Sequence, residues 1–332
     1  MRTCRDIATQ LLAPGKGILA ADESIGTMSA RLVKAGVEGT AENRRAYREL
    51  LATTPDLADG VSGIILCDET LNQRCGDSIP FAEALRAVGI LPGIKVDTGA
   101  KACPGLPGET VTEGLDGLPA RLAHYVELGA RFAKWRAVYT ITDSTPTPGA
   151  IAVNASALAR YAAACQEAGL VPIVEPEVVM NGNHSQLRCA EITAAVHAEV
   201  RAALALLDVD PAGMVLKPNM IVEGADHPTR AVPADVAAVT GKVLQAWPDD
   251  LAGVAFLSGG QEPERATANL AALQHLRTPW PLTFSFGRAL VTPALLAWRG
   301  HADRYADGQA ALAERVRANA AAVRSRTELQ RT

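Results

Sequence analysis

Three lysines and two arginines in this sequence lie in or directly after short apolar runs, and three acids share that placement. The cations are Lys95, Lys134, Arg136, Lys217 and Arg288, and the acids are Asp22, Glu175 and Glu177. A lysine that is buried and surrounded by other cations tends to lose its proton, and the neutral amine can attack a carbonyl. The set therefore predicts Schiff-base chemistry.

Lys217 is the candidate nucleophile because it directly follows the apolar run Met214–Leu216 and precedes Pro218 and Asn219. From the residues alone one alternative stays open, a structural lysine buried in an ion pair with Glu175 or Glu177. No histidine ends an apolar run, so we expect no metal site and no cofactor.

Glycine-rich turns after two neighbouring runs indicate phosphate binding. Ser258, Gly259 and Gly260 offer backbone N–H groups that no side chain obstructs, and Pro263 then begins a helix whose positive end faces the same place. After the next run, Gly287 and Arg288 supply the partner charge. These turns predict one phosphate site.

Eight short apolar runs bounded by Gly or Pro predict strands. They are Gly17–Ala21, Ser62–Cys67, Gly93–Val96, Phe132–Val138, Val171–Val174, Met214–Leu216, Val254–Leu257 and Leu282–Phe286. Their apolar residues are nearly continuous, which is typical of strands covered on both faces in a parallel sheet.

Helical patterns fill the gaps between these runs. Leu158–Glu167 carries an apolar stripe that ends before Gly169, and further stripes run from Val236 to Trp247 and onward from Pro263. Near the end of the chain, Asp307–Arg324 is rich in alanine and favours a helix.

Eight strands alternating with helices predict a (β/α)₈ TIM barrel, one domain over residues 1–332 with a short C-terminal helical tail. An open doubly wound sheet is the alternative, because Gly15–Ala20 imitates a dinucleotide-binding fingerprint. In that segment, however, Ile18–Ala21 itself has the pattern of a strand, whereas the fingerprint opens a helix.

Seven of the eight predicted strands end in polar residues, at the face where such barrels carry their chemistry. Besides the cations and acids above, these ends include Glu23, Ser24, Asp97, Ser258 and Ser285. We therefore expect these side chains to converge on one site.

Composition narrows the class of protein. The 332 residues are 48% hydrophobic and carry a net charge of −4, so nucleic acid is not expected as a partner. No stretch approaches the roughly 18 apolar residues of a membrane span. The N-terminus lacks a secretory pattern and the six cysteines lack the spacing of a disulfide framework or zinc site. These features predict a soluble, cytoplasmic protein with reduced thiols.

The assembled motifs resemble the class I fructose-bisphosphate aldolases. The resemblance covers about residues 15–298, and its motifs are Gly15–Ser24, Glu42–Arg45, Gly93–Asp97, Phe132–Arg136, Val171–Glu177, Leu216–Met220, Phe256–Gln261 and Thr283–Leu290. It implies metal-free, reversible cleavage of fructose 1,6-bisphosphate to dihydroxyacetone phosphate and glyceraldehyde 3-phosphate, in glycolysis and gluconeogenesis. It also implies a homo-oligomer, with a tetramer favoured.

Carried over by position, the resemblance implies the following roles. Lys217 forms the Schiff base, Glu175 is the acid/base of carbinolamine dehydration, and Asp22 takes the C4 hydroxyl proton. Lys134 and Glu177 support charge and proton placement. The C1 phosphate falls to Ser258, Gly259, Gly287 and Arg288, with Ser285 as a further substrate contact, and the rest of the sugar phosphate to Lys95, Arg136, Ser24 and Arg31.

One departure from the family lies at the C-terminus, where relatives commonly have a tyrosine and residues 325–332 contain no aromatic side chain. We expect this end to be catalytically inert. Two other functions stay open: a one-phosphate sugar aldolase or transaldolase that keeps Lys217, and a phosphosugar-binding barrel without catalysis.

Overall fold

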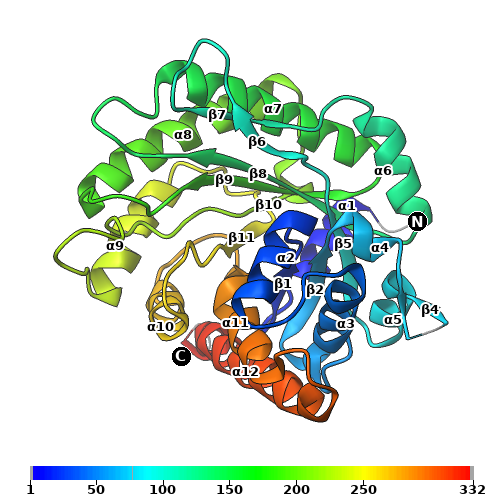
Figure 1. Ribbon diagram of the computed structural model, residues 1–332. Coiled ribbons are helices and arrows are strands. Elements are labelled where there is room, and N and C mark those ends of the chain that lie inside the picture. Colours follow the sequence, from blue (N-terminus) through cyan, green and yellow to red (C-terminus); the bar gives the residue numbers. More distant parts are fainter. Residues whose placement is uncertain (1–2, 77, 330–332) are drawn as a thin grey trace.

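The eight predicted strands form a closed barrel in which every pair of neighbours is parallel (Figure 1). Around the barrel their order is β1-β12-β11-β10-β9-β8-β5-β2. The computed structural model describes residues 3–76 and 78–329, with side chains up to residue 324. The predicted barrel is confirmed and the doubly wound alternative is wrong.

The barrel strands are β1 (Gly17–Ala21), β2 (Val61–Leu66), β5 (Leu91–Lys95), β8 (Phe132–Tyr139), β9 (Val171–Val178), β10 (Val215–Leu216), β11 (Gly253–Phe256) and β12 (Leu282–Phe286). The predicted bounds of β1 and β12 are confirmed. The predicted end of β9 at Val174 is wrong, because Glu175 and Glu177 continue the ladder opposite β8. Both acids are therefore strand residues.

Helices surround the barrel, and two short antiparallel hairpins project from it (Figure 1). The helices are α1 (Cys4–Leu11), α2 (Ile25–Lys34), α3 (Ala41–Ala52), α4 (Asp68–Leu71), α5 (Phe81–Ala87), α6 (Leu118–Glu127), α7 (Pro148–Glu167), α8 (Gln186–Leu206), α9 (Pro233–Leu244), α10 (Pro263–Leu273), α11 (Arg288–Trp298) and α12 (Tyr305–Leu329). The hairpins are β3 (Arg74–Cys75) with β4 (Ile79–Pro80), and β6 (Gly99–Ala102) with β7 (Thr110–Glu113).

The helical stripes are confirmed with adjusted ends. Leu158, Tyr161 and Cys165 are buried on α7, and Gly169 follows that helix with a positive φ. Trp247 is buried but lies beyond α9, which ends at Leu244.

An apolar layer fills the N-terminal end of the barrel. Interior side chains such as Ile18, Phe132 and Ile173 form one cluster with Leu11 of α1, so this helix closes the barrel from below. Gly93 is required there, because a Cβ would lie 2.2 Å from the Phe132 ring. This close packing fixes the strand positions from which the residues at the opposite, open end of the barrel project.

Charged side chains replace the apolar layer one step further along the strands. Interior positions recur every second residue, so each charged residue follows an interior apolar residue by two. The pairs are Ala20 and Asp22, Phe132 and Lys134, Ile173 and Glu175, and Val215 and Lys217. The alternation thus directs the four side chains into the C-terminal end of the barrel.

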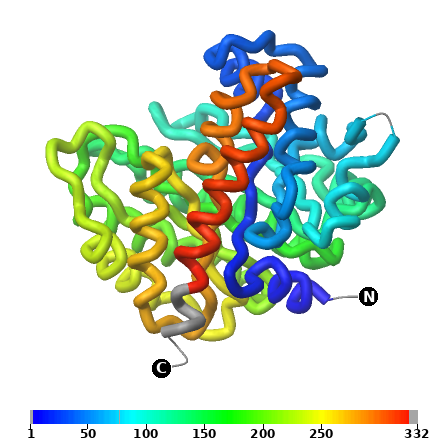
Figure 2. Tube along the Cα trace, turned by 90° about the horizontal axis from the view of Figure 1, so that it is seen from below, coloured from blue at the N-terminus to red at the C-terminus, as the bar shows by residue number. Residues whose placement is uncertain are grey.

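The last helix, α12, packs along α11 and α10, and Figure 2 shows it crossing that side of the molecule. The side chains of residues 325–332, which we expect to be catalytically inert, lie outside the described residues. All six cysteines are free thiols, as predicted. Within the described chain, no helix is long and apolar enough to span a bilayer.

Candidate active site

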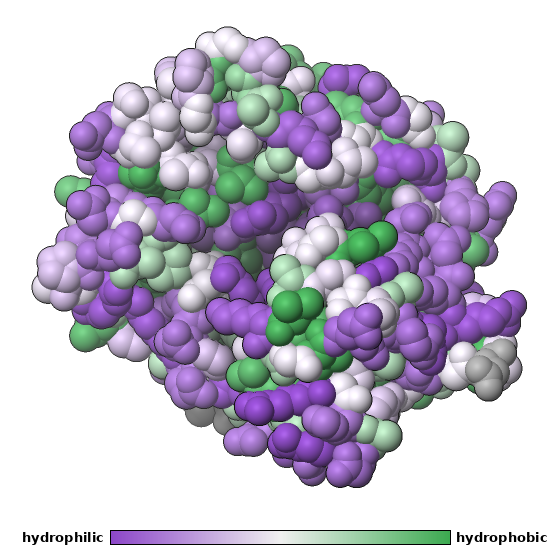
Figure 3. Space-filling view, in the orientation of Figure 1, coloured by the Kyte–Doolittle hydropathy of each residue, from purple (hydrophilic) through white to green (hydrophobic). Residues whose placement is uncertain are grey.

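The open end of the barrel holds a cavity of about 490 Å³. Figure 3 shows the corresponding hollow, floored by hydrophilic residues. All fourteen residues that the sequence assigns to the site line it: Asp22, Ser24, Arg31, Lys95, Lys134, Arg136, Glu175, Glu177, Lys217, Ser258, Gly259, Ser285, Gly287 and Arg288. The structure therefore brings together residues from seven barrel strands or the segments that follow them.

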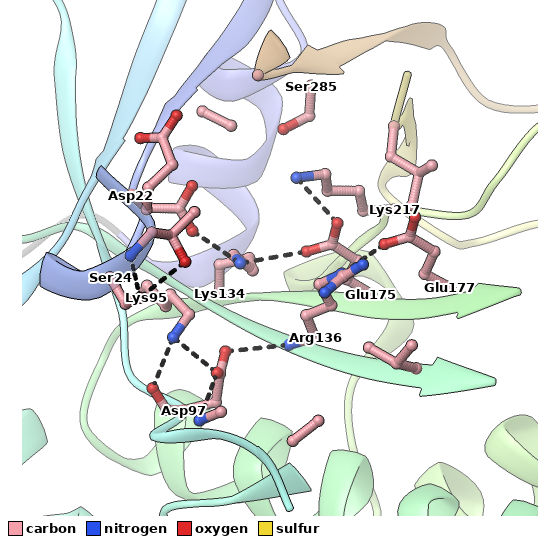
Figure 4. A pocket seen from close by; sticks show the side chains of 18 of the residues that line it. Asp22, Ser24, Lys95, Asp97, Lys134, Arg136, Glu175, Glu177, Lys217 and Ser285 are labelled. Carbon is pink, nitrogen blue, oxygen red and sulfur yellow. Dashed lines mark hydrogen bonds and ion pairs between the residues drawn. The ribbon is translucent and has the colours of Figure 1, made fainter. Parts of the chain in front are cut away.

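Lys217, Glu175, Lys134 and Asp22 form a continuous chain of ion pairs across the cavity floor (Figure 4). Lys217 Nζ lies 3.2 Å from Glu175 Oε1, and Lys134 Nζ lies 3.4 Å from Glu175 Oε2 and 2.7 Å from Asp22 Oδ2. Lys217 is only 3% exposed, and its backbone N–H donates to Val174 O beyond the end of β10. Two ammonium groups are thus bridged by the Glu175 carboxylate, and Asp22 contacts the second of them.

The charges on Asp22 and Lys134 stabilise each other. Burial by itself would raise the pKa of Asp22, but the ammonium groups of Lys134 and Lys217 outweigh it and lower that pKa to about 2. Burial likewise opposes the charge of Lys134, yet Asp22 and Glu175 raise the pKa of that lysine above its ordinary value. Asp22 is therefore ionised at neutral pH.

Four more ion pairs surround this floor. Arg136 Nε pairs with Glu177, and Lys95 Nζ lies 2.8 Å from Asp97 Oδ1. Arg31 pairs with Glu23, whose other oxygen lies 2.7 Å from Arg48 Nη2 on α3. Each of these cavity cations already has a carboxylate partner.

The glycine turn after β11 has the geometry of an anion cradle. Gly259 and Gly260 have φ of +60° and +86°, which exposes their backbone N–H groups without side-chain obstruction. Gln261 braces the turn, because its Nε2 donates to Ser258 O while its Oε1 accepts from Asn269. The helix α10 begins at Pro263, as predicted, and α11 begins nearby at Arg288.

Arg288 lies over this turn, since a Cβ on Gly260 would meet its Nη2 at 3.1 Å. Among the described residues it has no ion-pair or hydrogen-bond partner, and burial together with the charge of Arg31 lowers its pKa from the ordinary value. The Ser285 hydroxyl is also buried without a partner in the described part of the chain. Beside the glycine turn, Arg288 therefore offers a positive charge and Ser285 a hydrogen-bond donor.

The sequence profile described as "Fructose-bisphosphate aldolase class-I" matches residues 3–331. The chain belongs to this family. It is 49% identical over 317 residues to the probable fructose-bisphosphate aldolase class 1 of Xanthomonas axonopodis pv. citri (strain 306), which covers 95% of each chain. It is 48% identical to the cytosolic fructose-bisphosphate aldolase 6 of Arabidopsis thaliana, over 95% of this chain and 88% of the relative.

A solved structure of the Plasmodium falciparum fructose-bisphosphate aldolase, in complex with TRAP and a small-molecule inhibitor, superposes with a TM-score of 0.95. Its sequence is 42% identical, and the match covers 97% of this chain and 94% of that one. The chain is accordingly an enzyme, a carbon–carbon lyase of the aldolase type.

Several cavity residues have no role in the sequence-based assignment. Glu23 and Asp97 are visible as polar strand ends, but their function as partners of Arg31 and Lys95 depends on tertiary contacts. Thr27 and residues 98–101 of the β6–β7 hairpin also line the cavity. No apolar run marks that hairpin, so periodicity gives no signal for it.

Proposed function

We propose that Lys217 is the nucleophile with which this aldolase cleaves fructose 1,6-bisphosphate. The observation that carries the proposal is the 3.2 Å contact between Lys217 Nζ and Glu175 Oε1 inside an open cavity. A structural lysine paired with Glu175 would make the same contact, but it would not need an adjoining anion cradle. The family supports the chemical role.

In the proposed reaction, Lys217 first passes its ammonium proton to Glu175, and the resulting neutral amine attacks the C2 carbonyl of the sugar and forms a carbinolamine. Glu175 then returns this proton to the departing hydroxyl, which leaves as water and produces the iminium. Asp22 then takes the proton of the C4 hydroxyl, the C3–C4 bond breaks, and its electron pair flows into the iminium as an enamine. Glyceraldehyde 3-phosphate leaves first.

Protonation at C3 and hydrolysis of the iminium then release dihydroxyacetone phosphate and regenerate Lys217. Lys134 and Glu177 hold charge near these proton transfers. Ser258, Gly259, Gly287 and Arg288 hold the C1 phosphate, with Ser285 as the adjoining donor. Arg136, Lys95, Ser24 and Arg31 contact the remainder of the sugar phosphate.

The position of the strands favours a substrate with two anionic ends over a one-phosphate sugar. In the eight-membered ring, β11 with its glycine turn is four places from β5, which carries Lys95. An extended bisphosphate can therefore span the barrel mouth, with Lys217 of the β10 segment beneath it.

A cleavage assay tests this function. We expect the enzyme to convert fructose 1,6-bisphosphate into equal amounts of the two triose phosphates, and Lys217→Met to reduce kcat by at least about 10³-fold. Lys242→Met, on α9 away from this cavity, is the matched control. Near-normal cleavage by Lys217→Met would contradict the proposal.

We further propose a cytoplasmic homo-oligomer, with a tetramer favoured, acting in glycolysis and gluconeogenesis. The name of the Arabidopsis relative supports the location, and family membership supports the assembly. Light scattering coupled to size-exclusion chromatography measures the assembly directly, and a mass equal to one chain would contradict it.

A further inference from the structure

Seven cationic and five carboxylate side chains line the active-site cavity. Each carboxylate has a cation within ion-pair distance: Asp22 with Lys134, Glu23 with Arg31, Asp97 with Lys95, Glu175 with Lys217 and Glu177 with Arg136. Two cations therefore remain in excess. They are Arg288 and Lys101, neither of which has an ion-pair partner among the described residues.

The two excess cations come from different parts of the mouth. Arg288 begins α11 after β12, beside the glycine turn of β11. Lys101 lies on β6, in the hairpin that follows β5. Because β5 is opposite β11 in the ring, Lys101 is on the side away from the glycine turn.

The hairpin that carries Lys101 is held firmly on its base. Asp97 accepts hydrogen bonds from the backbone N–H groups of Gly99 at 3.1 Å and Arg136 at 3.2 Å. The Thr112 hydroxyl donates to Arg136 O at 2.8 Å. This base therefore fixes where the Lys101 backbone stands relative to the cavity.

The outer part of the hairpin is also anchored. Glu109, between β6 and β7, accepts from the backbone N–H of Thr147 at 2.7 Å and from its hydroxyl at 2.6 Å, at the start of α7. Asn154 of α7 accepts from Thr112 N and donates to Thr110 O. Lys101 is thus an exposed cation on a fixed support.

We propose that Lys101 is a specificity-determining residue that contacts the phosphate at the far end of the substrate from Arg288. The inference rests on the proposed function, because it assumes a sugar that carries a phosphate at each end. Lys95 on the same side is already neutralised by Asp97, so Lys101 supplies the uncompensated charge there. A sugar with a single phosphate at C1 leaves this lysine unused.

The test compares Lys101→Met with the unaltered enzyme on fructose 1,6-bisphosphate and on fructose 1-phosphate. We expect KM for the bisphosphate to rise about fivefold, the factor that corresponds to about 1 kcal/mol for an exposed charge pair, with little change in kcat. KM for fructose 1-phosphate should not change. Lys101→Arg should restore most of the affinity for the bisphosphate.

The dependence of the Lys101→Met effect on ionic strength is a second measurement, and a purely structural role of Lys101 would not produce it. The effect of Lys101→Met should be largest at about 0.01 M ionic strength and shrink towards 0.15 M, because the screening length falls from about 30 Å to about 8 Å. Lys34→Met is the matched control, since Lys34 is an exposed lysine of α2 and the cavity lining does not include it.

An unchanged KM for the bisphosphate at low salt, or an equal rise for both sugars, would overturn the assignment of Lys101. Failure of the proposed function looks different. In that case the unaltered enzyme would cleave neither sugar, or Lys217→Met would remain active. Either result would contradict the proposed function and, with it, the assignment of Lys101.

Discussion

Lys134 of β8 and Asp22 after β1 form a 2.7 Å ion pair even though β5 and β2 separate their strands in the barrel. The pair crosses the cavity floor and keeps Asp22 ionised, with its pKa at about 2. It places an ionised carboxylate two residues beyond Ala20 of the apolar layer, at the position of the proton acceptor in the proposed cleavage step.

Asp22→Asn should separate the two halves of the reaction. The amide cannot accept the C4 hydroxyl proton, so we expect cleavage of fructose 1,6-bisphosphate to fall by about 10²-fold or more. Lys217 should still form a Schiff base with dihydroxyacetone phosphate, because that step does not break C3–C4. Borohydride labelling alongside the cleavage assay measures both.

The matched control is Asp68→Asn, which changes an acid after β2 that accepts from Tyr125 and does not belong to the cavity lining. It should leave cleavage unchanged. Equal loss of labelling and cleavage in Asp22→Asn would contradict the role of Asp22 as the base of the cleavage step.

Arg288→Ala should weaken binding of both the bisphosphate and dihydroxyacetone phosphate by about 2 kcal/mol, since a charge-assisted contact is lost. Both ligands carry the phosphate that the glycine turn is proposed to hold. Titration calorimetry measures the two affinities, with the exposed Arg160→Ala on α7 as the control. Unchanged affinity for both ligands would remove Arg288 from the phosphate site.

Asn154→Ala should loosen the β6–β7 hairpin. The Asn154 side chain is fully buried and forms hydrogen bonds with Thr112 N, Thr110 O and Ala150 O at 2.8–3.0 Å. Its removal therefore leaves buried backbone groups without these hydrogen-bond partners. We expect the free energy of unfolding to fall by about 2 to 3 kcal/mol. We also expect a lower kcat/KM ratio of bisphosphate to monophosphate, because Lys101 loses its support.

Denaturant unfolding and steady-state kinetics give these two quantities. Asn72→Ala is a control of the same type at an exposed site, and it should lower the free energy of unfolding by well under about 1 kcal/mol. A loss of stability with an unchanged substrate ratio would contradict the proposed function of the hairpin.

His197 should make stability depend on pH. It is buried on α8 and its Nδ1 accepts a hydrogen bond from the Trp247 indole N–H at 3.1 Å. Burial, and secondarily Arg201, lowers the pKa of this histidine to about 3. Between about pH 6.5 and pH 3 the unfolded chain binds a proton that the folded chain does not, so stability falls as the pH falls through that window.

His197→Gln keeps a hydrogen-bond acceptor but does not titrate. Its free energy of unfolding should therefore depend less steeply on pH in this window. The reduction in slope should correspond to about one fewer proton taken up on unfolding. His124→Gln, at an exposed site, should keep the slope of the unaltered protein. Denaturant titrations at several pH values measure the slopes, and identical slopes for all three proteins would contradict this account.

The barrel was predictable from the sequence because its strands are covered on both faces. Gly17–Ala21 is a continuous apolar run, and Leu282–Phe286 is broken only by Thr283 and Ser285. Asp22 and Gly287 directly follow the two runs, so their bounds need no tertiary information. Glu175 and Glu177 are different. The sequence does not distinguish a charged side chain that faces a cavity from one that faces solvent. The hydrophobic pattern therefore ends β9 at Val174, before its observed end at Val178.

The same limit applies to the site. Lys217, Glu175 and Asp22 stand out because they end or interrupt buried runs. Lys101 lies in a short exposed hairpin next to Cys103–Gly108, which has the composition of an ordinary loop. Arg48 sits in a helix rich in charge, and only its contact with Glu23 explains why it is 2% exposed.

The assignment of Lys217 is tested most directly by borohydride reduction of the enzyme in the presence of dihydroxyacetone phosphate, followed by peptide mass mapping. The amine of Lys217 should be trapped as a reduced Schiff base at close to one label per chain. Lys134 and Lys95 should remain unlabelled, because each is paired with a carboxylate that the structure places 2.7–2.8 Å away. Label on either of those lysines, or no label at all, would contradict the assignment of Lys217 as the nucleophile.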